Sequence, residues 1–79
     1  MARYYFHIRQ GETIIAEDRE GLEFATPEMA VEEATKAARE LVVEMILAGN
    51  RVGDQEFEIR SSDGAVVKIV PFKSAAGLE

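Results

Sequence analysis

The side chains best suited to chemistry near the start of the chain are Tyr5, His7 and Arg9, which alternate along a strand-like segment, residues 3–9. Strand alternation places these three on one face of a sheet. The opposite face carries apolar side chains, namely Tyr4, Phe6 and Ile8. Aromatic and basic side chains on one sheet face are typical of surfaces that stack on bases or contact a partner. Tyr5, His7 and Arg9 are therefore the candidate binding face.

No catalytic, cofactor-binding or metal-ligating residue is predicted. His7 is the only histidine and the chain has no cysteine, so no second imidazole or thiolate can complete a metal site beside it. The acidic loop, residues 17–23, lacks the spacing of a calcium loop, and we expect its carboxylates to be solvated. Residues 61–64 have the composition of a turn rather than of a nucleophile loop.

Composition and charge narrow the possible partners. Nine Lys and Arg against fifteen Asp and Glu give a net charge of −6, which repels a phosphate backbone, and the basic residues form no run. We expect no nucleic-acid partner. No apolar run approaches the roughly 18 residues that a membrane span needs, so no membrane association is expected. Without cysteine, the chain suits a reducing compartment, and we expect a cytoplasmic protein.

The candidate binding face belongs to a predicted hairpin. Residues 3–9 and 12–16 alternate on either side of Gln10-Gly11, which favours a two-residue turn. That turn places Ile15 opposite Phe6, whereas a three-residue turn shifts the partner by one position. The register of this hairpin stays open.

A single long helix follows over residues 27–48. Thr26 is a favourable cap, Pro27 suits the first helical position, and Gly49-Asn50 ends the helix. Apolar residues recur at spacings of three and four on its core face, namely Ala30, Ala34, Ala38, Leu41 and Met45.

A second hairpin is predicted from residues 55–61 and 65–70. A two-residue loop would place Lys68 opposite Ile59 on the core face. A three-residue loop, residues 62–64, with Gly64 in the left-handed conformation of a bulge avoids this. It gives three favourable pairs, namely Ile59 with Val67, Phe57 with Ile69 and Glu58 with Lys68.

The end of the helix carries apolar residues on its outer side. Val43, Ile46 and Leu47 lie away from the core stripe. A helix of this length is about 33 Å long, against about 20–23 Å for strands of six or seven residues, so it should extend past its sheet. We predict that these three residues form a homodimer interface. The alternative is that the segment from residue 72 to 78 folds back over them.

These elements predict an α+β fold of ββαββ pattern, a four-stranded antiparallel sheet with one long helix packed on one face. Strand order is not determined. Residues 1–73 are expected to form a single domain and residues 74–79 a flexible tail, of which Leu78-Glu79 is typical of a cloning remnant.

The whole pattern resembles a known family. The opening at residues 3–9, the Gly21-Phe24 turn, the Glu33-Ala34 helix start and the ending at residues 70–72 are similar to short uncharacterised bacterial proteins of rhizobial type that begin with an R-Y-Y-F-H strand. The resemblance covers residues 3–72. It implies a fold and supplies no catalytic residues to carry over to this chain. A weaker likeness, carried by the same turn and helix start, is to HicB-type antitoxin domains.

The predicted function is a non-enzymatic protein-interaction module that acts as a homodimer and possesses no cofactor. The alternative is a regulatory domain of the HicB antitoxin type. A small enzyme or ligand-binding domain is the third interpretation.

Overall fold

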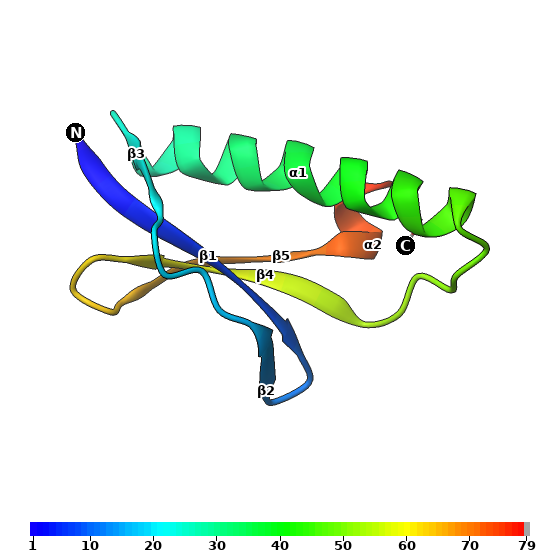
Figure 1. Cartoon of the computed structure of the whole chain (residues 1–79). Coiled ribbons are helices and arrows are strands. Elements are labelled where there is room, and N and C mark those ends of the chain that lie inside the picture. Colours follow the sequence, from blue (N-terminus) through cyan, green and yellow to red (C-terminus); the bar gives the residue numbers. More distant parts are fainter. Residues whose placement is uncertain (79) are drawn as a thin grey trace.

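The computed structural model describes residues 1–78, in which five strands and two helices follow one another along the chain (Figure 1). In chain order they are β1 Ala2–Gln10, β2 Thr13–Ala16, β3 Leu22–Phe24, α1 Pro27–Leu47, β4 Gln55–Ser61, β5 Val66–Pro71 and α2 Phe72–Ala75.

The strands form one antiparallel sheet in the order β2-β1-β4-β5, and β3 also pairs with β1. Helix α1 lies across one face of the sheet (Figure 1). The predicted α+β class is confirmed, but the count of four strands is wrong. The fifth strand, β3, comes from the end of the predicted charged loop. It forms because β1 has nine residues and β2 only four, so part of the β1 edge is left for a second short partner.

The first hairpin turns one residue later than expected. Gln10 pairs with Thr13 and Arg9 with Ile14, so the turn is Gly11-Glu12 rather than Gln10-Gly11. A bulge follows between Arg9 and Ile8. The pairing of β1 with β2 ends at Ile8, so Phe6 has no partner on β2.

The second hairpin has the predicted loop but a different register beyond it. Gly64 has a φ of 87°, and its N–H donates to the Ser61 carbonyl at 3.0 Å, as in the three-residue loop. The three predicted pairs are wrong, because a second irregularity shifts the strands between Ile59 and Arg60. The observed pairs are Ile59 with Lys68, Glu58 with Ile69 and Phe57 with Val70.

Packing against α1 explains this shift. The shifted register brings Val70, which is 6% exposed, into the core beside the helix. It moves Ile69 to the opposite face of the sheet. Lys68 lies on the helix side, where it lines a shallow hollow with Val31 and Thr35. The long apolar stem of a lysine can cover such a surface while its ammonium group stays in water.

The core lies between α1 and the sheet. Thr26 caps α1 as predicted, accepting the Met29 N–H at 3.1 Å. The buried residues on the helix are mostly alanines, which let it approach the sheet closely; they are Ala30, Ala34, Ala38 and Val42. Below them, aromatic rings contact one another in a chain, namely Tyr4, Phe24, Phe6, Phe57 and Phe72.

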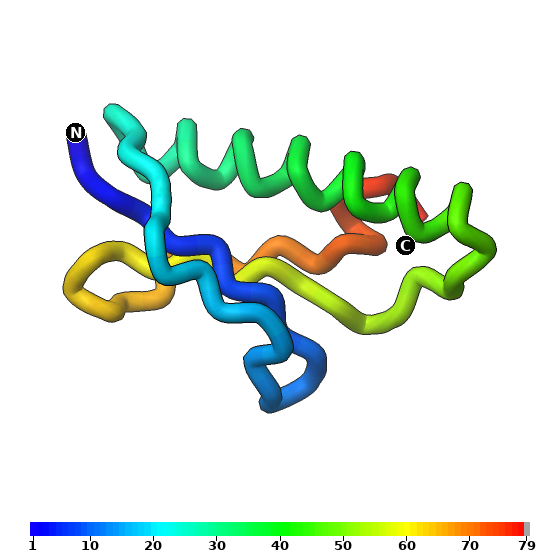
Figure 2. The backbone as a smooth tube through the Cα atoms, viewed as in Figure 1, coloured from blue at the N-terminus to red at the C-terminus, as the bar shows by residue number. Residues whose placement is uncertain are grey.

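The C-terminal segment differs from the predicted loose tail. Phe72 and Ala75 are buried and begin and end helix α2, so Ser74 and Ala75 lie in a helix. The Arg39 Nε donates to the Ala75 carbonyl at 2.6 Å, which ties α2 to α1. Figure 2 traces this segment back beside the second half of α1. Glu79 lies outside the described residues.

Candidate functional site

Charged and aromatic side chains gather on the face of the sheet that α1 does not cover. Tyr5, His7 and Arg9 all lie on this face, as their alternation predicts. Across the ladder from them on β4 lie three charged residues, namely Arg60, Glu58 and Glu56. The candidate binding face therefore exists as a surface, and its role in binding stays a prediction.

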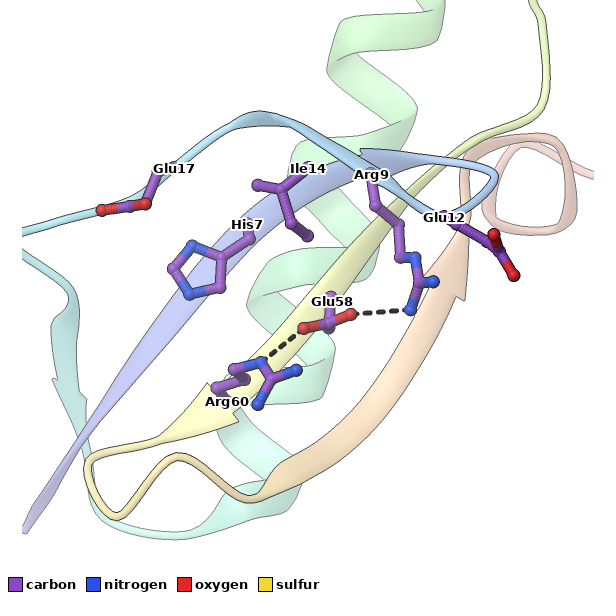
Figure 3. Close-up of a pocket in the computed structure, with 7 residues that line it drawn as sticks. All are labelled: His7, Arg9, Glu12, Ile14, Glu17, Glu58 and Arg60. Atoms are coloured by element: carbon purple, nitrogen blue, oxygen red, sulfur yellow. Dashed lines mark hydrogen bonds and ion pairs between the residues drawn. The ribbon is translucent and has the colours of Figure 1, made fainter.

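Glu58 is the centre of this face and is only 2% exposed. Its Oε2 accepts a hydrogen bond from Arg9 Nη1 at 2.7 Å, and its Oε1 accepts one from Arg60 Nε (Figure 3). Burial raises the pKa of Glu58, but the hydrogen bonds and positive charges of Arg60 and Arg9 outweigh it and lower the pKa. Glu58 is therefore an ionised carboxylate at neutral pH.

The two hairpin turns hold the arginines in place. Arg9 Nε donates to the Gly11 carbonyl at 2.9 Å, and Arg60 Nη1 donates to the Gly64 carbonyl at 2.6 Å. Each guanidinium is thus bound on one edge by Glu58 and on another by a turn. A planar group with two such contacts has little rotational freedom left.

These residues line an open hollow of about 480 Å³, which we call the arginine hollow. Its lining residues are His7, Arg9, Glu12, Ile14, Glu17, Glu58 and Arg60. The hairpin of β1 and β2 bends away from α1 (Figure 1), and its residues Arg9, Glu12 and Ile14 line the hollow. Figure 3 shows Glu12 and Glu17 at opposite ends, pointing away from the central cluster.

His7 is held by the acidic loop. Its Nδ1 accepts the Asp18 N–H at 3.0 Å, so in the neutral ring the proton lies on Nε2. The Asp18 carboxylate accepts three backbone N–H groups, from Phe6 at 3.0 Å, Gly21 at 3.0 Å and Glu20 at 3.2 Å. Burial raises the pKa of Asp18, but these hydrogen bonds lower it further than burial raises it.

A second surface lies at the C-terminal end of α1, which extends past the strands (Figure 1). Val43 is 54% exposed, Ile46 56% and Leu47 83%, and Leu78 beside them is 54% exposed. We call these four residues the helix-end surface. The C-terminal segment folds back as far as a hollow of about 290 Å³ that Leu78 lines with Val43 and Ile46. This alternative covering therefore leaves more than half of each side chain exposed.

Sequence reasoning missed that Glu58 is buried between two arginines. It also missed Asp18, which was expected to be solvated. The sequence signal was weak in both cases. Arg9 and Arg60 lie 51 residues apart in the sequence. The sequence did not determine strand order, so it did not show that β1 and β4 are neighbours in the sheet.

Comparisons with known proteins give one match. A family model described as a domain of unknown function (DUF6894) matches residues 3–73. Neither the curated proteins nor the solved structures gave a match. The predicted resemblance to a domain family of unknown function is confirmed, whereas the likeness to HicB-type domains finds no support. Among the described residues, no helix is long and apolar enough to cross a membrane.

Proposed function

The chain belongs to the DUF6894 family, and for this member we propose a non-enzymatic protein-interaction module that self-associates through the helix-end surface. The observation that carries the proposal is the exposure of Val43, Ile46 and Leu47, between 54% and 83%. Single exposed aliphatic side chains are common on protein surfaces. Several neighbours in one patch at a helix end are typical of an interface.

Charge complementarity favours a second copy of the chain as the partner. The last turn of α1 has no basic residue to offset the negative end of the helix dipole. In a two-fold antiparallel contact centred on Val43, residue 39 of each copy lies opposite residue 47 of the other. Arg39 would then lie near the C-terminal carbonyls of the partner helix, where a cation is stabilising.

The apolar area is enough for a weak dimer. Burying a fully exposed aliphatic side chain contributes about 1.5–3 kcal/mol. The residues of the helix-end surface are 54–83% exposed, so each contributes about 1 kcal/mol. Two copies of the four side chains exceed a minimal association cost of about 4 kcal/mol. The free energy that remains after this cost is also about 4 kcal/mol, which corresponds to a dissociation constant of about 1 mM or tighter.

Two carboxylates that fixed donors hold, those of Asp18 and Glu58, are unsuited to general acid catalysis. The pKa values of Asp18 and Glu58 are lowered, and their carboxylates accept hydrogen bonds from fixed donors. A general acid near neutral pH needs a raised pKa instead.

We also propose that the module works in the cytoplasm. The chain has no cysteine and 30% of its residues are charged, a composition that suits a reducing aqueous compartment. Fractionation of cells that produce the protein checks this, and recovery with membrane or secreted fractions would contradict it.

The dimer is tested by sedimentation equilibrium up to about 1 mM protein. The variant Val43→Lys with Leu47→Lys adds two charges to the helix-end surface, and lysine near a helix C-terminus preserves the helix. We expect wild type to form a dimer and this variant to be a monomer with unchanged circular dichroism.

The matched control is Glu32→Gln with Glu33→Gln, which changes the net charge equally on an exposed part of α1. It should associate like wild type. A wild type that stays monomeric at the highest concentration, or a control that dissociates as much as the lysine variant, would end the proposal.

A further inference from the structure

We propose that the arginine hollow is a binding site for an oxyanion, a carboxylate or phosphate group bound by the donors of Arg9 and Arg60 that Glu58 leaves free. This site is separate from the helix-end surface. It lies on the open face of the sheet, and its two cationic side chains come from β1 and β4.

Burial of Glu58 prepares the two arginines for a ligand. A carboxylate on a sheet face without a covering layer would normally be exposed, yet this one is 2% exposed because the guanidinium groups lie over it. Both of its oxygens are bound, one to each arginine. Glu58 is therefore a positioning residue. The trio carries one positive charge, which Glu56 balances through an ion pair with Arg9 Nε at 3.7 Å, so a ligand is held by hydrogen bonds to the guanidinium groups rather than by a net charge.

Each arginine keeps donors for a ligand. Arg9 uses Nη1 and Nε, and Arg60 uses Nε and Nη1, in the hydrogen bonds described above. Within residues 1–78, no hydrogen bond is formed by the Nη2 of either side chain. The two side chains remain 28% and 38% exposed, and they flank the Glu58 carboxylate in the hollow (Figure 3). Guanidinium groups held in this way suit the oxygens of carboxylate and phosphate groups.

Among the acidic residues around the two arginines, Glu56 pairs with Arg9 Nε at 3.7 Å, whereas Glu12 and Glu17 at the rim point away from the central cluster. Glu17 is 59% exposed and pairs with Arg19 at 3.2 Å, and Glu12 points outward at the other end. Exposed charges like these are screened by salt, whereas short hydrogen bonds to a ligand are not. The net charge of −6 repels an extended polyanion more strongly than a single small anionic group, so we expect the ligand to be small.

The test is an NMR titration of the full chain with sodium phosphate and, separately, with sodium acetate, with sodium chloride replaced so that ionic strength stays constant. The readout is the side-chain Nε–H signals of Arg9 and Arg60. We expect saturable shifts of both signals. Arg60→Gln should weaken binding by about tenfold or more, since a charge-assisted hydrogen bond is lost. Arg51→Gln, an exposed arginine elsewhere, should leave binding unchanged.

The two anions separate the ligand classes. Saturation by phosphate alone assigns the site to phosphate groups, and saturation by acetate alone assigns it to carboxylates. If Arg60→Gln is unfolded by circular dichroism, Arg60→Lys replaces it, because lysine keeps the charge but loses the planar fork and should also bind more weakly. Linear, unsaturated shifts with both anions in wild type, or equal weakening in Arg51→Gln, would overturn the proposal.

Discussion

Asp18 completes the edge of β1 with one side chain. That edge pairs with β3 up to Tyr4 and with β2 from Ile8 onward, so the Phe6 N–H between them lacks a strand partner. The Asp18 carboxylate accepts it at 3.0 Å and closes the loop back on itself through the Gly21 N–H. The acidic loop is therefore structural at this position, which charge and spacing did not indicate.

This role predicts a pH-dependent effect of Asp18→Asn. The folded pKa of Asp18 is lowered, so its carboxylate stabilises the fold above the unfolded pKa of about 3.9, and this stabilisation is lost as pH falls through the folded pKa. At pH 7 we expect the variant to lose about 1 kcal/mol of unfolding free energy, because charged hydrogen bonds become neutral ones. Urea denaturation at pH 7 and near pH 3 measures both values.

The loss should be smaller near pH 3 than at pH 7. Asp54→Asn is the matched control, because the Asp54 side chain is 91% exposed, and it should change little at either pH. A loss that is the same at both pH values would show that the carboxylate charge is not what matters.

The connections between strands depend on glycines for two different reasons. Gly64 and Gly21 both have positive φ, 87° and 66°. A Cβ on Gly64 would meet nothing within 4 Å, whereas a Cβ on Gly21 would lie 2.7 Å from the Tyr4 carbonyl oxygen and 2.9 Å from the Tyr5 ring. The loop between β2 and β3 is thus pressed against β1, while the turn between β4 and β5 is open.

Alanine at these two positions should separate conformational strain from steric contact. Gly64→Ala should cost about 1 kcal/mol, the penalty of the left-handed conformation. Gly21→Ala should cost about 3 kcal/mol, since overpacking adds to the same penalty. Urea denaturation of both variants beside wild type measures the difference. Equal costs would mean that the loop moves away from β1 without resistance.

A single helix layer leaves one face of the sheet uncovered. The charges of the molecule influence which partners can approach that face. Arg9 and Arg60 on this face are balanced by Glu58 and Glu56, and the chain as a whole carries −6. The long-range field therefore repels polyanions, whereas the proposed binding of a single anionic group depends on short-range hydrogen bonds.

We accordingly expect weak binding to duplex and single-stranded nucleic acid at physiological salt. Fluorescence anisotropy with labelled oligonucleotides of both kinds provides the measurement, repeated over a range of salt concentrations. A submicromolar affinity that falls steeply with salt would contradict the expectation, because it would require several phosphate contacts.

Features that depend on neighbours along the chain could be predicted from the amino-acid sequence alone. The cap at Thr26, the α1 span, the alternation of Tyr5, His7 and Arg9, and the left-handed Gly64 all agree with the structure. Each follows from the conformational preference or spacing of residues a few positions apart, so one sequence is enough to predict it.

Features that depend on contacts between distant segments could not be predicted in this way. The fifth strand needs the free edge of β1, the shifted register of β5 needs the packing of Val70 under α1, and the buried Glu58 needs β1 beside β4. Helix α2 needs the core contacts of Phe72, which packs on Phe57. Alternation along each strand is compatible with several pairings, and the contacts that choose among them join residues that only the folded chain brings together.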